Sequence, residues 1–277
     1  MTTENRHHSI GVFDSGVGGL TVLSSITDLL PDYNFIYLGD NARVPYGTRS
    51  FETVYKYTLE GVKKLYELGC RLIIIACNTA SAKALRTIQQ NDLSKFPEPL
   101  KVLGVIRPTV ETIGGLSKTK HIGIFATSGT VNSESYLLET HKLFPDVKVF
   151  QESCPIWVSL IEQNEFNNEG GEFFIKKNCE NLISKSSNID TIILGCTHYP
   201  IIKEQIKKYI PQNISVISQG EIVAESLKNY LERHPEIEKT LAQNEKQTFF
   251  TTENPKEFNK KSLLFINKHI ESSLIVL

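Results

Sequence analysis

Runs of apolar residues that end abruptly in small polar residues recur along this chain. The clearest run is residues 72–76, Leu-Ile-Ile-Ile-Ala, which is followed by Cys77, Asn78 and Thr79. A short, continuous apolar run is typical of a strand buried on both faces of a parallel sheet. A helical pattern follows over residues 82–90, so we expect the polar residues to form a strand-to-helix turn. Open α/β sheets bind ligands at such turns, beyond the carboxyl ends of their strands.

The same pattern returns at residues 191–195, which are followed by Cys196. Ile-Gly-Val-Phe at residues 10–13 and Ile-Gly-Ile-Phe at residues 122–125 are 112 positions apart, and the two cysteines are 119 apart. Similar offsets for two pairs of landmarks indicate two copies of one α/β unit. If the copies face each other, both cysteines converge on one cleft. Other apolar runs predict strands over residues 9–13, 34–38, 101–106, 121–125, 213–218 and 247–251, and helices over residues 51–68 and 222–231.

Composition and charge narrow the possible functions only slightly. The chain of 277 residues is 40% hydrophobic and 22% charged, which is ordinary for globular domains. Its net charge of −1 gives no electrostatic argument for binding nucleic acid or an anionic membrane. No segment has the length and apolarity of a membrane span. The stretch at residues 1–8 lacks the apolar core of a secretion signal, so we expect a cytoplasmic protein.

The cysteines and the first glycine-rich turn are the remaining chemical signals. Five cysteines are an odd number without the close spacing of a structural zinc site, so we expect free thiols. The turn at residues 14–19, Asp-Ser-Gly-Val-Gly-Gly, lacks the third glycine of a dinucleotide fingerprint and the lysine of a P-loop. Two interpretations of this turn remain, a small carboxylate site and a tight turn without a ligand.

Two thiols that face each other across a ligand suit proton transfer. A thiolate is a competent base and a thiol a competent acid near neutral pH, so one cysteine can remove a proton from one face while the other delivers one to the opposite face. This operation inverts a stereocentre. Asp14 and His198 are candidates to tune the thiols, and Ser15, Asn78, Thr79 and Thr197 are candidates to hold carboxylates. The alternative is that each cysteine is a small buried hydrophobe.

Four separated blocks in this sequence resemble the signature motifs of one family. They are Asp14-Ser-Gly-Val-Gly-Gly19, Pro45-Tyr-Gly47, Ala76-Cys-Asn-Thr-Ala-Ser81 and Leu194-Gly-Cys-Thr-His-Tyr-Pro200. The blocks and their order are similar to those of the glutamate racemases in the aspartate/glutamate racemase family. The resemblance implies an isomerase that supplies D-glutamate for peptidoglycan without a cofactor or a metal. It also implies a homodimer.

The resemblance further implies residue roles and a fold. Cys77 and Cys196 are implied to be the two acid/base residues, and Asp14 and His198 to assist them. Asp40 and Glu162 fall at acidic positions linked to the site, whereas Arg107, Ser153 and Trp157 depart from the usual family residues. The implied substrate-binding residues are Asp14, Ser15, Tyr46, Gly47, Asn78, Thr79, Thr127, Thr130, Thr197 and His198.

The implied fold consists of two facing parallel-sheet α/β domains related by a pseudo-twofold axis, with the active site in the interdomain cleft. We expect residues 1–100 and 214–277 to form the first domain, which carries Cys77, and residues 101–213 to form the second, which carries Cys196. The last elements of the chain therefore return to the first domain.

Three alternative functions stay open from the sequence. A racemase acting on aspartate or another acidic amino acid would share both thiols. A hydrolase with Cys196 as the nucleophile and His198 as its base would leave Cys77 without a task. An amino-acid-binding sensor on the same scaffold would bind a ligand without exchanging its Cα hydrogen.

Overall fold

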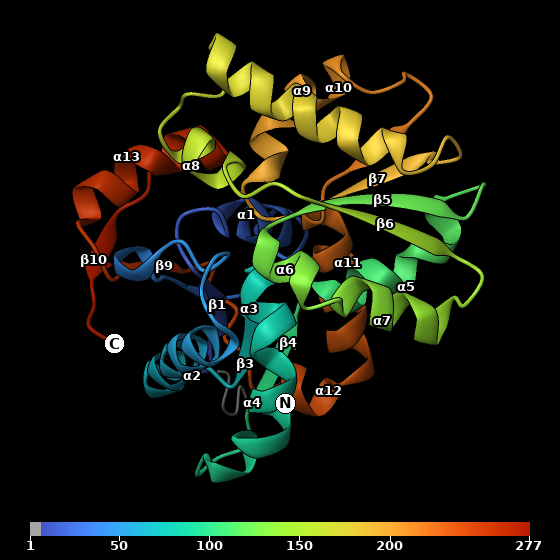
Figure 1. Ribbon diagram of the computed structural model, residues 1–277. Helices are drawn as coiled ribbons and strands as arrows, with labels where there is room; N and C mark the ends of the chain where they lie inside the picture. Colours follow the sequence, from blue (N-terminus) through green and yellow to red (C-terminus); the bar gives the residue numbers. More distant parts are fainter. Residues whose placement is uncertain (1–6) are drawn as a thin grey trace.

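The computed structural model describes residues 7–277 as two parallel β-sheets surrounded by helices (Figure 1). Most of the stretch considered as a secretion signal, residues 1–6, lies outside the described residues. The strands are β1 (Ile10–Asp14), β2 (Phe35–Gly39), β3 (Leu72–Ile75), β4 (Lys101–Gly104), β5 (His121–Ala126), β6 (Lys148–Ser153), β7 (Thr191–Gly195), β8 (Ser215–Ile217), β9 (Gln247–Thr251) and β10 (Ser272–Leu274).

The α-helices cover the sheets and connect their strands. They are α1 (Leu20–Leu29), α2 (Phe51–Glu67), α3 (Asn78–Lys83), α4 (Leu85–Asn91), α5 (Ile106–Leu116), α6 (Ser128–Asn132), α7 (Ser135–Leu143), α8 (Trp157–Glu162), α9 (Glu169–Ser184), α10 (Lys203–Lys208), α11 (Gly220–Arg233), α12 (Pro235–Glu238) and α13 (Pro255–Ile266), with short 3-10 turns at Asn41–Arg43, Leu93–Lys95 and Tyr199–Ile202. Across residues 7–277, every helix is too short or too polar to cross a membrane.

The two sheets repeat one topology. The larger sheet has the order β10-β9-β2-β1-β3-β4 and the smaller one β6-β5-β7-β8, and all their strand pairs are parallel. The segment β2-β1-β3-β4 therefore corresponds strand for strand to β6-β5-β7-β8. This confirms the prediction of two parallel-sheet α/β domains, and it explains why the strands that precede Cys77 and Cys196 occupy matching places. At the end of the chain, β9 pairs with β2 in the first sheet, and β10 pairs with β9.

The sheets do not divide where the predicted domain boundaries lie. β4, predicted to belong to the second domain, pairs with β3 in the first sheet, and β8, predicted to belong to the first domain, pairs with β7 in the second. By strand pairing, the chain crosses to the second unit after residue 104 and returns after residue 217. The helices that follow these two strands, α5 and α11, pack against each other where the units meet.

The central strands are buried on both faces, as their apolar sequences predict. In β3, Leu72 and Ile74 point into one hydrophobic core, whereas Ile73 and Ile75 point into another on the opposite face. The first of these cores is continuous with residues of β7 and contains α1 and α11, which lie together between the two units (Figure 1). This alternation fixes the register of the strand, so the position of Cys77 at its carboxyl end is fixed too.

Candidate active site

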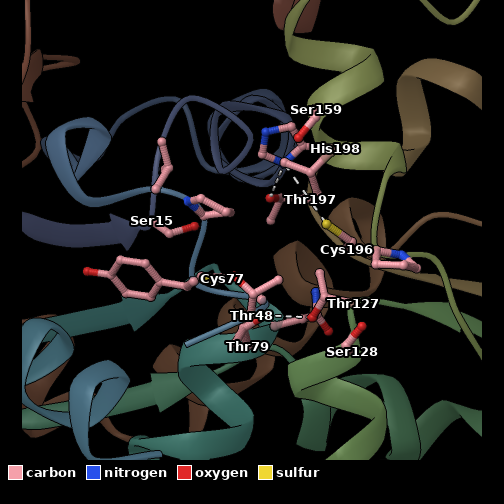
Figure 2. A pocket seen from close by; sticks show the side chains of 17 residues that line it. Ser15, Thr48, Cys77, Thr79, Thr127, Ser128, Ser159, Cys196, Thr197 and His198 are labelled. Atoms are coloured by element: carbon pink, nitrogen blue, oxygen red, sulfur yellow. Dashed lines mark hydrogen bonds between the residues drawn. The ribbon is translucent and has the colours of Figure 1, made fainter. Parts of the chain in front are cut away.

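The carboxyl ends of the central strands of both sheets line one narrow cavity (Figure 2). Its volume of about 40 Å³ leaves room for only a few water molecules, at roughly 10–15 Å³ each. Cys77 and Cys196 lie on opposite sides of it. The residues predicted for the site that line the cavity are Ser15, Tyr46, Gly47, Cys77, Asn78, Thr79, Thr127, Cys196, Thr197 and His198.

Cys77 lies between β3 and α3, where its sulfur accepts a hydrogen bond from the backbone N–H of Ala80 at 3.4 Å. The side chain is buried. Burial, with a smaller contribution from the negative charge of Asp14, raises the pKa of the Cys77 thiol to about 12, although a hydrogen bond with Ser15 opposes the shift. Cys77 is therefore a thiol, and a proton donor, near neutral pH.

Cys196 has a histidine as its partner. The Cys196 sulfur lies 4.0 Å from Nδ1 of His198, whose ring is almost fully buried. Burial alone would lower the pKa of His198, but its hydrogen bonds with Cys196 and Glu162 raise the pKa to about 10. The ring is therefore an imidazolium near neutral pH, and its positive charge lies next to the Cys196 sulfur.

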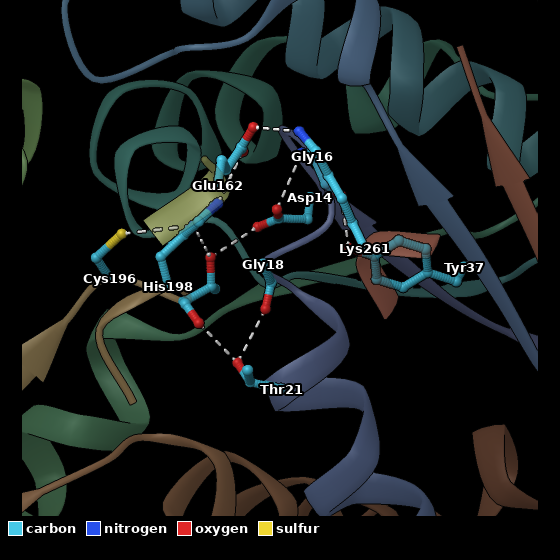
Figure 3. Close-up of polar contacts among 10 residues, drawn as sticks. Asp14, Gly16, Gly18, Thr21, Tyr37, Glu162, Cys196, His198 and Lys261 are labelled. Carbon is cyan, nitrogen blue, oxygen red and sulfur yellow. Dashed lines mark hydrogen bonds and ion pairs between the residues drawn. The ribbon is translucent and has the colours of Figure 1, made fainter. Parts of the chain in front are cut away.

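Glu162 lies behind His198 and does not line the cavity (Figure 3). Its Oε1 lies 3.0 Å from Nε2 of His198, and its Oε2 accepts a hydrogen bond from Nζ of Lys261 at 2.9 Å. Burial would raise the pKa of Glu162, but its contacts with these two cations lower the pKa to about 2. The sequence singled out Glu162 and His198 but not Lys261, which is on α13.

Asp14, at the end of β1, is also behind the cavity wall and is fully buried. Its carboxylate accepts hydrogen bonds from the backbone N–H of Gly16 at 3.0 Å and from the hydroxyl of Thr197 at 3.5 Å. Burial raises its pKa, against the opposing charge of His198. Because Thr197 follows β7, this carboxylate links the ends of the two sheets.

The predicted threonines come together from both units. The hydroxyls of Thr79 and Thr127 lie 2.8 Å apart, and that of Thr130 lies 3.1 Å from Thr127. Thr130 is fully buried behind Thr127 and is not part of the cavity wall. Nearby, the carbonyl of Gly47 accepts a hydrogen bond from the N–H of Gly129 at 2.7 Å. These contacts bring the turn after β5 against the loop that contains Tyr46.

Two polar networks support residues of the wall. The amide of Asn78 donates to Oε1 of Gln219 and accepts from the hydroxyl of Tyr136, both at 2.7 Å. The hydroxyl of Tyr46 donates to the buried carboxylate of Asp40. Asp40 therefore acts on the site through Tyr46 and not by lining the cavity.

Sequence reasoning missed several residues of the site. The further residues that line the cavity are Val44, Pro45, Thr48, Ser128, Pro155, Val158 and Ser159. Two of them had a usable signal: Pro45 belongs to the Pro45-Tyr-Gly47 block, and Ser159 lies three positions before Glu162 and hence on the same face of α8. Among the described residues that line the cavity there is no Arg or Lys. Within residues 7–277, no group of three or more His, Cys, Asp or Glu side chains is placed to hold a metal ion.

These features define a class of protein, a two-unit α/β protein with paired thiols at equivalent strand ends. The family model of the Asp/Glu/Hydantoin racemases matches residues 10–227. The chain therefore belongs to the Asp/Glu/Hydantoin racemase family, whose racemases are isomerases.

Within that family, the chain is similar to the glutamate racemases. It is 38% identical to the glutamate racemase of Roseobacter denitrificans over 96% of this chain and 99% of that protein, and 40% identical to that of Persephonella marina over 95% of each. Its fold matches a glutamate racemase of Bacillus anthracis with a TM-score of 0.89 and 33% identity, covering 99% of both chains. It also matches the Francisella tularensis enzyme in complex with D-glutamate, with a TM-score of 0.85 and 33% identity over 97% of both chains.

Proposed function

We propose that this protein is a glutamate racemase that interconverts L- and D-glutamate by proton transfer at Cα between two cysteines, without a cofactor. The observation that carries the proposal is the placement of Cys77 and Cys196 at equivalent strand ends on opposite sides of one narrow cavity. A racemisation needs an acid and a base on opposite faces of the carbon. The similarity to glutamate racemases, one of them solved in complex with D-glutamate, supports glutamate as the substrate.

The reaction conserves protons and electrons within the site. A thiolate at one cysteine takes the Cα proton, and the electron pair of the broken C–H bond stays on the substrate as a carbanion delocalised into its carboxylate. The thiol opposite then gives its proton to the other face of Cα. The cysteine that acted as the acid is left as a thiolate, and the cysteine that acted as the base is left as a thiol. A proton therefore returns from the second to the first before the next turnover in the same direction. Preorganised donors in a water-poor cavity stabilise the carbanion.

The two cysteines are not equivalent at rest. The imidazolium of His198 lies beside Cys196, whereas burial keeps Cys77 a thiol. In the resting form we therefore assign Cys196 as the base and Cys77 as the acid for one enantiomer. For the opposite enantiomer, Cys77 is the base and Cys196 the acid. A proton must therefore move from Cys77 to Cys196 before the Cα proton of that enantiomer is removed.

Hydroxyl groups are the substrate-binding groups in this proposal. Ser15, Thr79, Thr127 and Thr197 line the cavity together with the backbone around Gly47. They can donate hydrogen bonds to both carboxylates of glutamate. Glutamate is larger than a cavity of about 40 Å³, so the two units must separate to admit it and close over it afterwards.

Proton NMR of L-glutamate in D₂O tests the function directly. Wild-type protein should replace the Cα proton by deuterium and form D-glutamate, whereas Cys77→Ser and Cys196→Ser should each lose most of this activity. Cys179→Ser, at a buried thiol on α9 outside the site, is the matched control and should behave like wild type.

Each alternative predicts a different result in the same assay. Exchange of aspartate and not glutamate would identify an aspartate racemase. A hydrolase built on Cys196 and His198 would exchange neither amino acid and would keep its own hydrolytic activity in Cys77→Ser, whereas ligand binding without exchange would favour a sensor. Any of these results would contradict the proposed reaction.

We further propose that the enzyme supplies D-glutamate for peptidoglycan in the cytoplasm and acts as a homodimer. The support is the resemblance to glutamate racemases. Growth of a D-glutamate auxotroph that expresses this chain tests the first point, and light scattering coupled to size-exclusion chromatography tests the second.

A further inference from the structure

Helix α13, close to the end of the chain, reaches the catalytic histidine of the other unit. It packs against α1, β9 and β10 of the first unit and lies beside α8 of the second (Figure 1). Lys261 and Phe265 are four residues apart and so share one face of α13. The ring of Phe265 packs edge-on against that of His198, with 5.2 Å between the ring centroids. Lys261 bonds to Glu162.

Glu162 connects Lys261 to His198 because each of its carboxylate oxygens binds a different cation. Oε1 binds Nε2 of His198 at 3.0 Å, and Oε2 binds Nζ of Lys261 at 2.9 Å (Figure 3). Only 10% of the Glu162 side chain and 4% of the His198 side chain are exposed. A buried carboxylate with a partner on both oxygens is held in one rotamer. Removal of Lys261 frees Oε2 and lets the carboxylate turn away from the imidazole.

We propose that Lys261 is a positioning residue for proton transfer at Cys196. Its ammonium fixes the Glu162 carboxylate that orients His198, and it thereby connects the Cys196 half-reaction to the contact between the two units. The inference rests on the proposed racemase function, but it goes beyond that function because Lys261 touches neither the cavity nor a thiol.

The position of Lys261 makes it specific to one of the two thiols. Cys77 is flanked by Ser15 and Ala80, and Asp14 lies near it, whereas Lys261 reaches Cys196 through Glu162 and His198. Loss of Lys261 should therefore impair proton transfer at Cys196 and leave transfer at Cys77 intact. This asymmetry distinguishes a positioning role from a general loss of structure.

The experiment compares Lys261→Met with Lys260→Met in racemisation of both enantiomers. Lys260 is the adjacent, exposed lysine of α13. Lys260→Met therefore removes the same charge from the helix and leaves the contact between Lys261 and Glu162 in place. We expect Lys261→Met to lower kcat/KM by about 10- to 100-fold. This is a part of the rate enhancement of about 10²- to 10⁴-fold that a positioned acid or base contributes. The decrease must be equal in both directions because the equilibrium constant of a racemisation is one. Lys260→Met should match wild type.

The decisive measurement is the isotope effect with glutamate deuterated at Cα. For the enantiomer whose Cα proton goes to Cys196, the impaired step is the one that breaks the labelled bond, so the isotope effect on kcat/KM should rise. For the other enantiomer the impaired step delivers an unlabelled proton, so the isotope effect should fall. A variant that merely contains less folded enzyme loses rate but keeps both isotope effects.

Lys261→Arg, which preserves the ion pair, should restore most of the rate. Lys261→Gln provides a second neutral variant if the methionine variant is poorly folded, and thermal unfolding monitors both. Unchanged isotope effects in both neutral variants, or a rate loss equal to that of Lys260→Met, would overturn the role of Lys261. Absence of exchange in the wild-type protein would instead overturn the proposed function.

Discussion

Gly18, in the turn after β1, lies directly against the ring of His198, which follows β7 in the other unit. A Cβ atom at Gly18 would be 2.4 Å from Nδ1 of His198 and 2.5 Å from the hydroxyl of Thr197. The glycine is therefore needed for close approach between the two units, which supports a packing role for this glycine of the first motif. The same nitrogen faces Cys196.

Substitution of Gly18 by alanine should displace His198 from Cys196. We expect Gly18→Ala to lower kcat/KM by about 100-fold or more and to destabilise the fold by roughly 1–3 kcal/mol, as overpacked sites do. Gly115→Ala is the control, because a Cβ there meets no atom within 4 Å and Gly115 lies within helix α5. That variant should be fully active and about 0.5–1 kcal/mol more stable. Steady-state kinetics and urea unfolding measure both effects, and an active Gly18→Ala enzyme would contradict the steric argument.

Gln219 is the centre of a buried amide network between the two units. Its Nε2 donates to the hydroxyls of Tyr136 and Thr109, both at 2.7 Å, and its Oε1 accepts from Asn78. Gln219→Leu removes the acceptor of the buried Asn78 N–H, whereas the hydroxyls of Tyr136 and Thr109 keep their own bonds to Asn78 and to the carbonyl of Val105. A buried donor left unsatisfied costs about 1–3 kcal/mol. We expect a clear loss of unfolding free energy in urea and a raised KM, because Asn78 borders the cavity.

The exposed Gln90 on α4 provides the control for this network. Gln90→Leu should change neither stability nor KM appreciably. If Gln219→Leu were as stable as Gln90→Leu, the network would not hold the joint between the units.

The hydroxyl of Tyr46 tests how Asp40 acts on the site. Tyr46→Phe keeps the ring in the cavity wall but removes the bond to the Asp40 carboxylate, which keeps Arg43 at 2.6 Å and Thr252 at 2.9 Å. A hydrogen bond to a charged group contributes about 1.5–3 kcal/mol, so stability should fall by roughly that amount. KM should rise more than kcat falls, because the loop is loosened and the thiols are unchanged. A large loss of kcat would mean that the hydroxyl acts in the chemistry.

The pH dependence of stability should depend on His198. Its pKa in the folded protein is about 10, above the ordinary value of 6.5, so its stabilising contribution is complete below pH 6.5 and is lost as the pH rises towards 10. Between pH 6.5 and 8.5 the free energy of unfolding should fall by about 2 kcal/mol. The full linkage is roughly 1.4 kcal/mol per pH unit, and coupling of His198 to its neighbours reduces it. Urea unfolding of wild type and His198→Asn at several pH values measures it. Equal slopes for the two proteins would contradict the assignment.

The contribution of Glu162 to stability depends on pH in the opposite direction. Its pKa is lowered from 4.5 to about 2, so its contribution is present above pH 4.5 and is lost as the pH falls towards 2. Glu162 and His198 together therefore contribute most to the free energy of unfolding between pH 4.5 and 6.5.

The sequence predicted the parts of this molecule that depend on local pattern. The strand before Cys77 is an uninterrupted apolar run, as β3 confirms, but the polar residues predicted to form a turn after it are helical, because α3 begins at Asn78 with Cys77 as its N-cap. β6 was not predicted, because Lys148 to Ser153 contains both exposed and half-buried positions at a sheet edge and lacks a continuous apolar run.

The supporting residues of the site could not be predicted from spacing. Lys261 is 99 positions from Glu162, and Gln219 is 141 positions from Asn78. No periodicity connects residues so far apart, and both are of types that usually lie on the surface. Only the folded arrangement of the two units brings them together.

The return of β9, α13 and β10 to the first sheet determines when this protein can become active during synthesis on the ribosome. The second unit, from β5 to β8, is contiguous in sequence and can close as soon as it emerges, whereas the first sheet stays incomplete until β9, which pairs with β2, and β10 have been translated. Lys261 emerges between these two strands. A nascent chain that stops short of these last elements therefore contains both Cys77 and Cys196 but has an incomplete first sheet and lacks Lys261.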